Sequence, residues 1–261
     1  MPPLTSLAPI FVVLFFGGGM LLERFCAARP LPQVAGWYLR ASLMFVPTMA
    51  IGAFVPLLVA ERCAGHSPLH LEVLGTWGGA LVGVLCSDFV AYWLHRAQHE
   101  NAALWRFTHQ LHHSAERVDV LGAAYFHPLD IAIGSLLTSG VVAILGLATD
   151  AVAVAALFTL FMGVLQHLNL KTPVWLGLLV QRPESHSLHH ARGLHQGNYG
   201  NLALWDMVFG TFRNPAEFTS VAGFYDGASR RVGAMLLGRD IQREPSAKLD
   251  SAVTELGSQG P

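Results

Sequence analysis

The chain has 261 residues, of which 52% are hydrophobic and only 13% are charged, and its formal net charge is −1. Soluble domains carry about 25% charged residues, so this composition excludes an ordinary soluble protein and indicates a membrane protein. The near-neutral charge also excludes a nucleic-acid partner, because such a partner requires a basic surface.

The apolar residues come in blocks, which is typical of membrane-crossing helices. Five blocks follow one another along the chain: Leu7–Leu22, Ala41–Ala60, Leu71–Leu94, Ile131–Leu147 and Ala151–Leu168. A crossing helix needs ~20 apolar residues, and the last two blocks are shorter. The sequence therefore predicts an all-α integral membrane bundle with four to five spans. The first block follows MPPLTSLAP, which lacks the basic region of a signal peptide, so we expect a retained helix.

The distribution of Lys and Arg predicts the orientation, because basic residues collect in cytoplasmic loops. With five spans, Arg62 is the only one of the sixteen basic residues in a predicted outer loop. This arrangement places the N-terminus outside and the C-terminus in the cytoplasm. His66 and His70 lie in the same outer loop as Arg62, and all other histidines fall on the cytoplasmic side.

Three histidine clusters follow helical spacing. They consist of His95 and His99, of His109, His112 and His113, and of His186, His189 and His190. Residues three or four apart share a helix face, and neutral imidazole is the commonest protein ligand for transition metals. A lone histidine on an apolar helix is more often a satisfied core residue, but unpaired buried imidazoles in three clusters are costly. Eight histidines exceed the needs of one tetrahedral metal, so the sequence predicts a cytoplasmic cap with two metals.

Further polar residues accompany these clusters. His167 ends the fifth span and is predicted to be a ligand, whereas His127 precedes Pro128 and is either a helix cap or a ligand. Asp88 shares a helix stripe with His95 and His99, and we expect its carboxylate to accept a hydrogen bond from a ligand imidazole. Three residues are candidates to assist the site without binding metal: Asp88, His195 and Asn198.

The chain divides into one predicted catalytic domain and a tail. Residues 1–238 form the membrane domain, with the histidine motifs between 88 and 213. Residues 239–261 have few aromatic and many small or charged residues, which predicts a disordered end. Pro173 opens the segment PVWLGLLVQ, which we expect to lie in the membrane interface. The three cysteines show no CxxC spacing, so neither an iron–sulfur cluster nor a disulfide framework is expected.

Four segments carry a family resemblance: DFVAYWLHRAQH at 88–99, HQLHH at 109–113, HSLHH at 186–190 and NYGNLALWDMVFGTF at 198–212. With these motifs in this order, the chain resembles the fatty acid hydroxylase/sterol desaturase superfamily of membrane-bound, histidine-rich di-iron oxygenases. The resemblance implies that two iron ions are held by the eight clustered histidines, with His167 and His127 completing the set.

The same resemblance implies the reaction. Members of this superfamily use O2 and two electrons to hydroxylate or desaturate an unactivated C–H bond of a lipid, such as a sterol, a fatty acyl chain, a carotenoid or an alkyl ether. No GxGxxG motif follows a strand, so no flavin or nicotinamide site is expected, and the electrons come from a separate donor protein, an external reductase. The loop 191–197 is short and carries His195, which departs from the longer, more acidic loop expected of the superfamily.

Three other functions are consistent with clustered histidines: a zinc-dependent membrane hydrolase, a membrane metal transporter and a heme-binding electron carrier, which a Soret absorption band would reveal. A zinc-dependent membrane hydrolase would normally carry HExxH, which is absent from this sequence. A membrane metal transporter would place its ligands near the middle of the bilayer, whereas these histidines gather at one face. The sequence favours the oxygenase.

Overall fold

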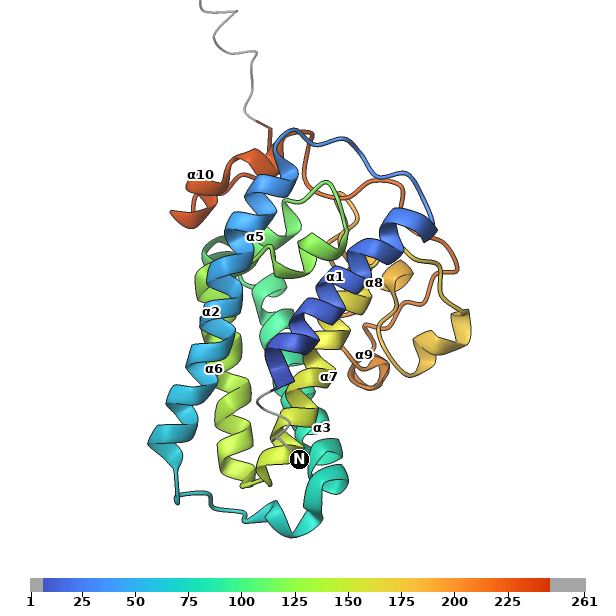
Figure 1. The fold of residues 1–261 in the computed structure, drawn as a ribbon. Coiled ribbons are helices and arrows are strands. Elements are labelled where there is room, and N and C mark those ends of the chain that lie inside the picture. Colours follow the sequence, from blue (N-terminus) through green and yellow to red (C-terminus); the bar gives the residue numbers. More distant parts are fainter. Residues whose placement is uncertain (1–6, 245–261) are drawn as a thin grey trace, which may run out of the picture.

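A computed structural model describes residues 7–244, and these residues are almost entirely helical (Figure 1). The only β-type pairings within the described range are two isolated antiparallel bridges, Val180 with Leu202 and Ala191 with Ala222. The predicted all-α fold is confirmed.

Five long helices form the body of the molecule. They are α1 (Ala8–Cys26), α2 (Trp37–Cys63), α3 (Gly75–Glu100), α6 (Pro128–Leu145) and α7 (Thr149–His167). Each is long and apolar enough to cross a membrane, α3 together with the preceding turn η2 (Leu71–Leu74). Each overlaps one predicted apolar block, but α3 continues six residues beyond the predicted end at Leu94. His95 and His99 therefore lie on the same continuous helix as the apolar segment, just beyond its predicted end.

The long helices pack through α2 against α6 and through α3 against both α6 and α7. Small residues bring α3 and α7 close together. A Cβ built on Gly79 would lie only 2.8 Å from the Cβ of Ala151, and one on Gly83 would lie 3.4 Å from that of Ala155. Such small-residue contacts are typical of helices that associate in a membrane, where close backbone approach replaces the hydrophobic driving force.

The short elements gather at one end of the bundle and form a cap (Figure 1). This end holds the last residues of α1, α3 and α7 and the first residues of α2 and α6. The cap comprises α4 (Ala102–Leu104), the π-helical turn η3 (Trp105–His109), α5 (Gln110–His113), η4 (Val120–Ala124), η5 (Val174–Leu178), α8 (Pro183–His189), α9 (Ala203–Val208), η6 (Ala228–Arg230) and α10 (Val232–Leu236). Every histidine predicted to bind metal belongs to this end.

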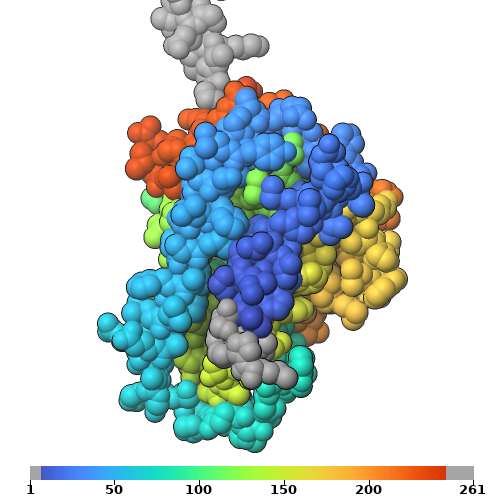
Figure 2. Space-filling view, in the orientation of Figure 1, coloured from blue at the N-terminus to red at the C-terminus, as the bar shows by residue number. Residues whose placement is uncertain are grey.

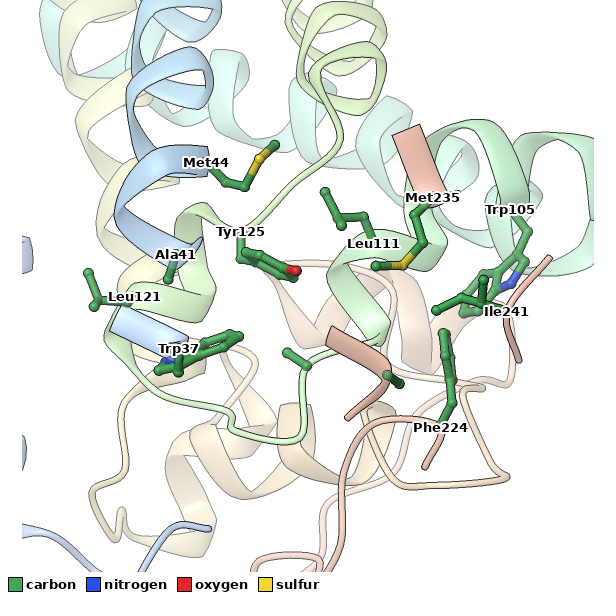
Figure 3. Close-up of a cluster of buried hydrophobic side chains, with 12 residues drawn as sticks. Trp37, Ala41, Met44, Trp105, Leu111, Leu121, Tyr125, Phe224, Met235 and Ile241 are labelled. Atoms are coloured by element: carbon green, nitrogen blue, oxygen red, sulfur yellow. The ribbon is translucent and has the colours of Figure 1, made fainter. Parts of the chain in front are cut away.

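A buried apolar cluster ties the cap to α2 (Figure 3). Trp37 at the start of α2 packs against Tyr125 with the two rings tilted by 54°, and it donates its indole N–H to Asp119, with N···O distances of 3.0 and 3.2 Å. Ile241 belongs to the same cluster and is 1% exposed, and Gln110 donates to the carbonyl of Arg239. Residues 239 and 241, at the start of the predicted tail, thus contact the cap core. Residues 245–261 of that tail lie outside the described residues.

Candidate metal centre

Nine histidines converge in the cap in two separate groups. The first group is His95, His99, His109, His113 and His189, and the second is His112, His167, His186 and His190. Within each group, one nitrogen from every ring lies within 4.8 Å of the others. Each set is large enough to surround one transition-metal ion.

Neighbouring histidines in the sequence belong to different groups. His113 and His189 face the first group, while His112 and His190 face the second. Successive residues on a helix point about 100° apart, so each HH pair serves two sites that lie side by side. The rings of His113 and His190 stack at 4.2 Å with planes 13° apart, which places the two groups in contact. The π-helical turn η3 lies just before the His112–His113 pair and widens the helix at the site.

The rings of the first group are oriented through their Nδ1 atoms. His95 Nδ1 lies 2.8 Å from the carbonyl of Tyr199, and His189 Nδ1 lies 2.7 Å from that of Gly197. A carbonyl only accepts, so both Nδ1 atoms donate and both Nε2 atoms present a lone pair. All five Nε2 atoms of this group are buried, and none has a hydrogen-bond partner among the described residues. Buried unpaired acceptors are costly, and a bound cation would satisfy all five.

The second group shows the same need for a cation. His167 Nδ1 donates to the carbonyl of Gly163 over 2.8 Å, so its Nε2 carries a lone pair. The Nε2 atom of His186 lies 3.2 Å from that of His167 and 3.1 Å from that of His190. A single proton on Nε2 of His186 cannot form hydrogen bonds to the Nε2 atoms of both His167 and His190. A metal ion bound by all three nitrogens would resolve this arrangement.

Burial keeps these imidazoles in the form that binds metal. The six grouped histidines outside the membrane-spanning helices are buried, and burial lowers the pKa of each imidazole well below its usual range: His109, His112, His113, His186, His189 and His190. Neighbouring histidines lower these pKa values further. The rings are therefore neutral at pH 7, and neutral imidazole is the ligand form.

Asp130 is the carboxylate that orients a predicted ligand, and the sequence interpretation missed it. Its Oδ2 lies 2.7 Å from Nδ1 of His109, and its Oδ1 accepts from the side-chain amide of Gln98 over 2.8 Å. Asp130 is 7% exposed. A carboxylate on the far nitrogen of a ligand imidazole fixes the tautomer and raises ligand basicity. The available signal was an Asp in the first turn of an apolar helix, two residues after Pro128.

Asp88, which we expected in this role, holds a loop instead. Its two oxygens accept from the backbone amides of Asn201 and Leu202, over 2.9 and 3.0 Å. This loop carries Tyr199, whose carbonyl orients His95. Asn198 supports the same loop, because its side chain accepts from the amide of Arg213 and donates to the carbonyl of Ser185. Both residues therefore hold the loop beside the first histidine group through backbone contacts.

His127 and His195 lie outside the two groups. His127 caps α6, and its Nδ1 accepts from the amide of Leu129 over 3.1 Å. Its Nε2 lies 3.4 Å from the carbonyl of Leu236, so both nitrogens have neighbours other than the site. The Nδ1 of His195 lies 3.0 Å from Nδ1 of His113, and burial lowers the pKa of His195 to about 4. His195 has a φ of 42°, a left-handed conformation that is uncommon for a residue with a side chain.

The fatty acid hydroxylase family model matches residues 80–211, which is just over half of the chain. The chain belongs to the fatty acid hydroxylase family. The matched range contains both histidine groups in full, as well as Asp88, Asp130 and Asn198. The resemblance found in the four sequence motifs is thereby confirmed.

Several curated relatives of this family member act on lipids according to their names. An ornithine lipid hydroxylase of Rhizobium tropici is 36% identical over 66% of this chain and 54% of its own length. An alkylglycerol monooxygenase of Homo sapiens is 33% identical over 54% of this chain and 32% of its own. A Delta(7)-sterol-C5(6)-desaturase of Nicotiana tabacum is 29% identical over 53% of this chain and 51% of its own. The chain thus spans about half or less of these relatives, and no solved structure matches it.

A buried ion pair braces α8, which carries two of the grouped histidines and is followed directly by a third in this hydroxylase-family chain. Arg182 and Glu184 at the start of α8 are both 0% exposed and lie 3.0 Å apart. Glu184 also accepts from the amide and the hydroxyl of Thr172, over 2.7 and 2.8 Å. The pair therefore fixes α8 against the segment that follows α7.

Replacing Glu184 with glutamine should destabilise the protein by ~3–5 kcal/mol, because it leaves the buried Arg182 without its counter-charge. Glu217→Gln is the matched control, since Glu217 pairs with Lys171 at the surface and such pairs contribute ~0–1 kcal/mol. Thermal unfolding of both variants in the same detergent measures the difference. Equal midpoints would show that the buried pair does not brace α8.

Proposed function

We propose that this protein is an O2-dependent di-iron oxidoreductase that hydroxylates or desaturates an unactivated C–H bond of a lipid. The observation that carries the proposal is the pair of adjacent histidine groups: the first has five Nε2 atoms without a hydrogen-bond partner, and the second brings three Nε2 atoms into mutual contact. The ligand set comprises the nine grouped histidines, and His127 is left outside it. The family and the names of the relatives support a lipid substrate.

Iron suits this donor set, because imidazole binds Fe(II) well and open coordination positions admit O2. Two bound irons would supply the redox chemistry that uses O2 on a C–H bond. For hydroxylation, the lipid, O2, two electrons and two protons give the hydroxylated lipid and one water. Because the protein must receive two electrons per turnover, we propose a separate electron-donor protein as partner.

The chain's own residues hold and shield the reacting centre. Asp130 accepts the Nδ1 proton of His109 and keeps Nε2 of that ring available to the first group. Phe126 lies face to face with His112, with ring centroids 3.9 Å apart, and Trp105 lies 5.0 Å from His99. These apolar rings exclude water from the sides of the two groups, which favours oxidation of the lipid over wasteful side reactions.

We further propose that the N-terminus lies outside the cell and that the histidine-rich cap and the C-terminus lie in the cytoplasm. An odd number of crossings would put the two ends of the chain on opposite sides, and the basic residues within 7–244, except Arg62, belong to the cap end. Reducing equivalents are available in the cytoplasm, so this orientation suits an enzyme that takes electrons from another protein.

Metal content tests the proposal first. Protein purified in detergent from iron-supplemented cells should contain about two iron ions per chain and show no Soret band. The same preparation, with O2, a chemical reductant and a lipid panel of fatty acyl, sterol, carotenoid and alkyl-ether compounds, should yield an oxidised lipid. Folded protein that binds no metal would overturn the proposal. Two zinc ions with lipid hydrolysis, and no oxidation after iron reconstitution, would favour a zinc hydrolase.

A further inference from the structure

A groove lies between α1 and the start of α2, apart from the histidine groups. Phe16 and Phe45 pack edge to face, with ring centroids 4.9 Å apart, and join the two helices at this point. Toward the cap the helices diverge (Figure 1), and a cavity of about 980 Å³ lies between them. Figure 2 shows the hollow between the blue segments, with green atoms at its floor. The residues lining the cavity include Arg117, Asp119 and Leu121 from the cap.

The groove is apolar along α1 and cationic at the cap end. Its apolar wall extends over about two turns of α1, from Val13 to Leu21, which is ~12 Å of helix. Beyond this wall the lining contains Glu23, Arg24 and Arg29. An apolar wall that ends in charged groups matches an amphiphile with its chain along the helix and its headgroup at the cap.

The charges at the cap end leave two arginines without a carboxylate partner. Arg117 pairs with Asp119 over 2.9 Å, so these two charges offset each other. The Glu23 carboxylate accepts hydrogen bonds from the backbone amides of Val120 and Asn169, and these bonds hold it against the cap segments beside the groove. Arg24 and Arg29 form no ion pair with any described residue. Nη1 of Arg29 donates to the carbonyl of Thr219, and its Nε is buried without a hydrogen-bond partner among the described residues. The free charge in the groove is therefore positive.

Two glycines keep the groove open. A Cβ built on Gly17 or Gly18 would have no neighbouring heavy atom within 4 Å, and both residues line the cavity. The next residue, Gly19, faces the opposite way, where a Cβ would lie 2.9 Å from Val120. Close packing thus requires only the third glycine of the run, while the first two leave space in the groove.

We propose that this groove binds an anionic membrane phospholipid, with one acyl chain against α1 and the phosphate between Arg24 and Arg29. Guanidinium groups bind phosphate through paired, charge-assisted hydrogen bonds, and the apolar wall removes the chain from water or detergent. The site is separate from the proposed catalytic centre, because the cavity lining contains none of the nine grouped histidines. Lipid binding here does not depend on metal.

Filling the groove tests its apolar half. Gly18→Leu should weaken binding of phosphatidic acid by about tenfold or more, as measured by native mass spectrometry of detergent-solubilised protein titrated with the lipid. Gly140→Leu is the matched control, since Gly140 in α6 also has no neighbour within 4 Å but lies outside the groove. Both variants should match the unaltered protein in elution volume and metal content. Equal lipid affinity of the two leucine variants would overturn the site.

Neutralising the cap end tests the headgroup. Arg24→Gln should weaken phosphatidic acid binding about tenfold and leave binding of phosphatidylcholine nearly unchanged, because the loss of a charged hydrogen bond falls on the anionic headgroup. Arg62→Gln, at the opposite end of α2, is the control and should change neither. Equal losses for both lipids would overturn the anionic specificity. Displacement of the lipid by inorganic phosphate alone would assign the site to free anions.

Discussion

Replacing His189 with alanine should remove one metal ion from the protein, and replacing its neighbour His190 should remove the other. The two residues are adjacent in the sequence but face different groups. Each variant should therefore retain close to one metal ion per chain instead of two. Turnover should fall by at least ~100-fold in both variants. Mutating a residue that hydrogen-bonds to a metal ligand typically costs ~10- to 100-fold in activity, and removing the ligand itself should cost more. Elemental analysis and a lipid oxidation assay measure the two effects.

His112 and His113 provide an independent repeat of this experiment. His112→Ala should behave like His190→Ala, and His113→Ala like His189→Ala, because of their group membership. The double variant His189→Ala/His113→Ala should keep the metal of the second group. Loss of both metals from every single variant, in protein that elutes as the unaltered chain does, would show that the two groups do not bind independently.

Replacing Asp130 with asparagine should lower metal affinity or turnover ~10- to 100-fold while the fold is retained. Asparagine has almost the same shape and can keep the hydrogen bond from Gln98, but it removes the negative charge beside Nδ1 of His109. The ligand ring then loses basicity and a fixed tautomer. Iron content after dialysis against a graded series of chelator concentrations measures the change.

Asp150→Asn is the matched control for Asp130, because Asp150 lies exposed in the first turn of α7 at the opposite end of the bundle. It should leave iron content and turnover unchanged. Wild-type iron retention by Asp130→Asn would show that the carboxylate is a structural partner of Gln98 and does not tune the ligand. Asp88→Asn offers a second comparison, since Asp88 acts on the loop that carries Tyr199.

Local sequence patterns were sufficient for the helices and for most of the histidines that gather at the cap end. Hydropathy located all five long helices, because a membrane-crossing segment must satisfy its backbone internally and expose apolar side chains. Helical spacing identified the eight clustered histidines, since i, i+3 and i+4 neighbours share a face whatever the rest of the fold does. His167 was also predicted correctly to join the others at the cap end, where it enters the second group.

The roles of single polar residues depended on contacts that no local pattern encodes. Asp88 shares the stripe of His95 and His99, yet its carboxylate binds backbone amides more than a hundred residues away. Asp130 orients a histidine that precedes it by 21 residues on a different helix. Ile241 is apolar within a polar stretch, and only the cap core shows that it is buried. Each case is a side chain whose partner is brought near by folding.

By itself, the sequence determined that this chain is a helical membrane protein with three histidine clusters at helical spacing, because composition and helical periodicity are properties of adjacent residues. The tertiary structure decided how those histidines divide. Splitting each HH pair between two groups requires α3, α5, α7 and α8 to meet at one point. It also decided that α1 and α2 diverge and leave a groove, because helix separation depends on packing between distant segments.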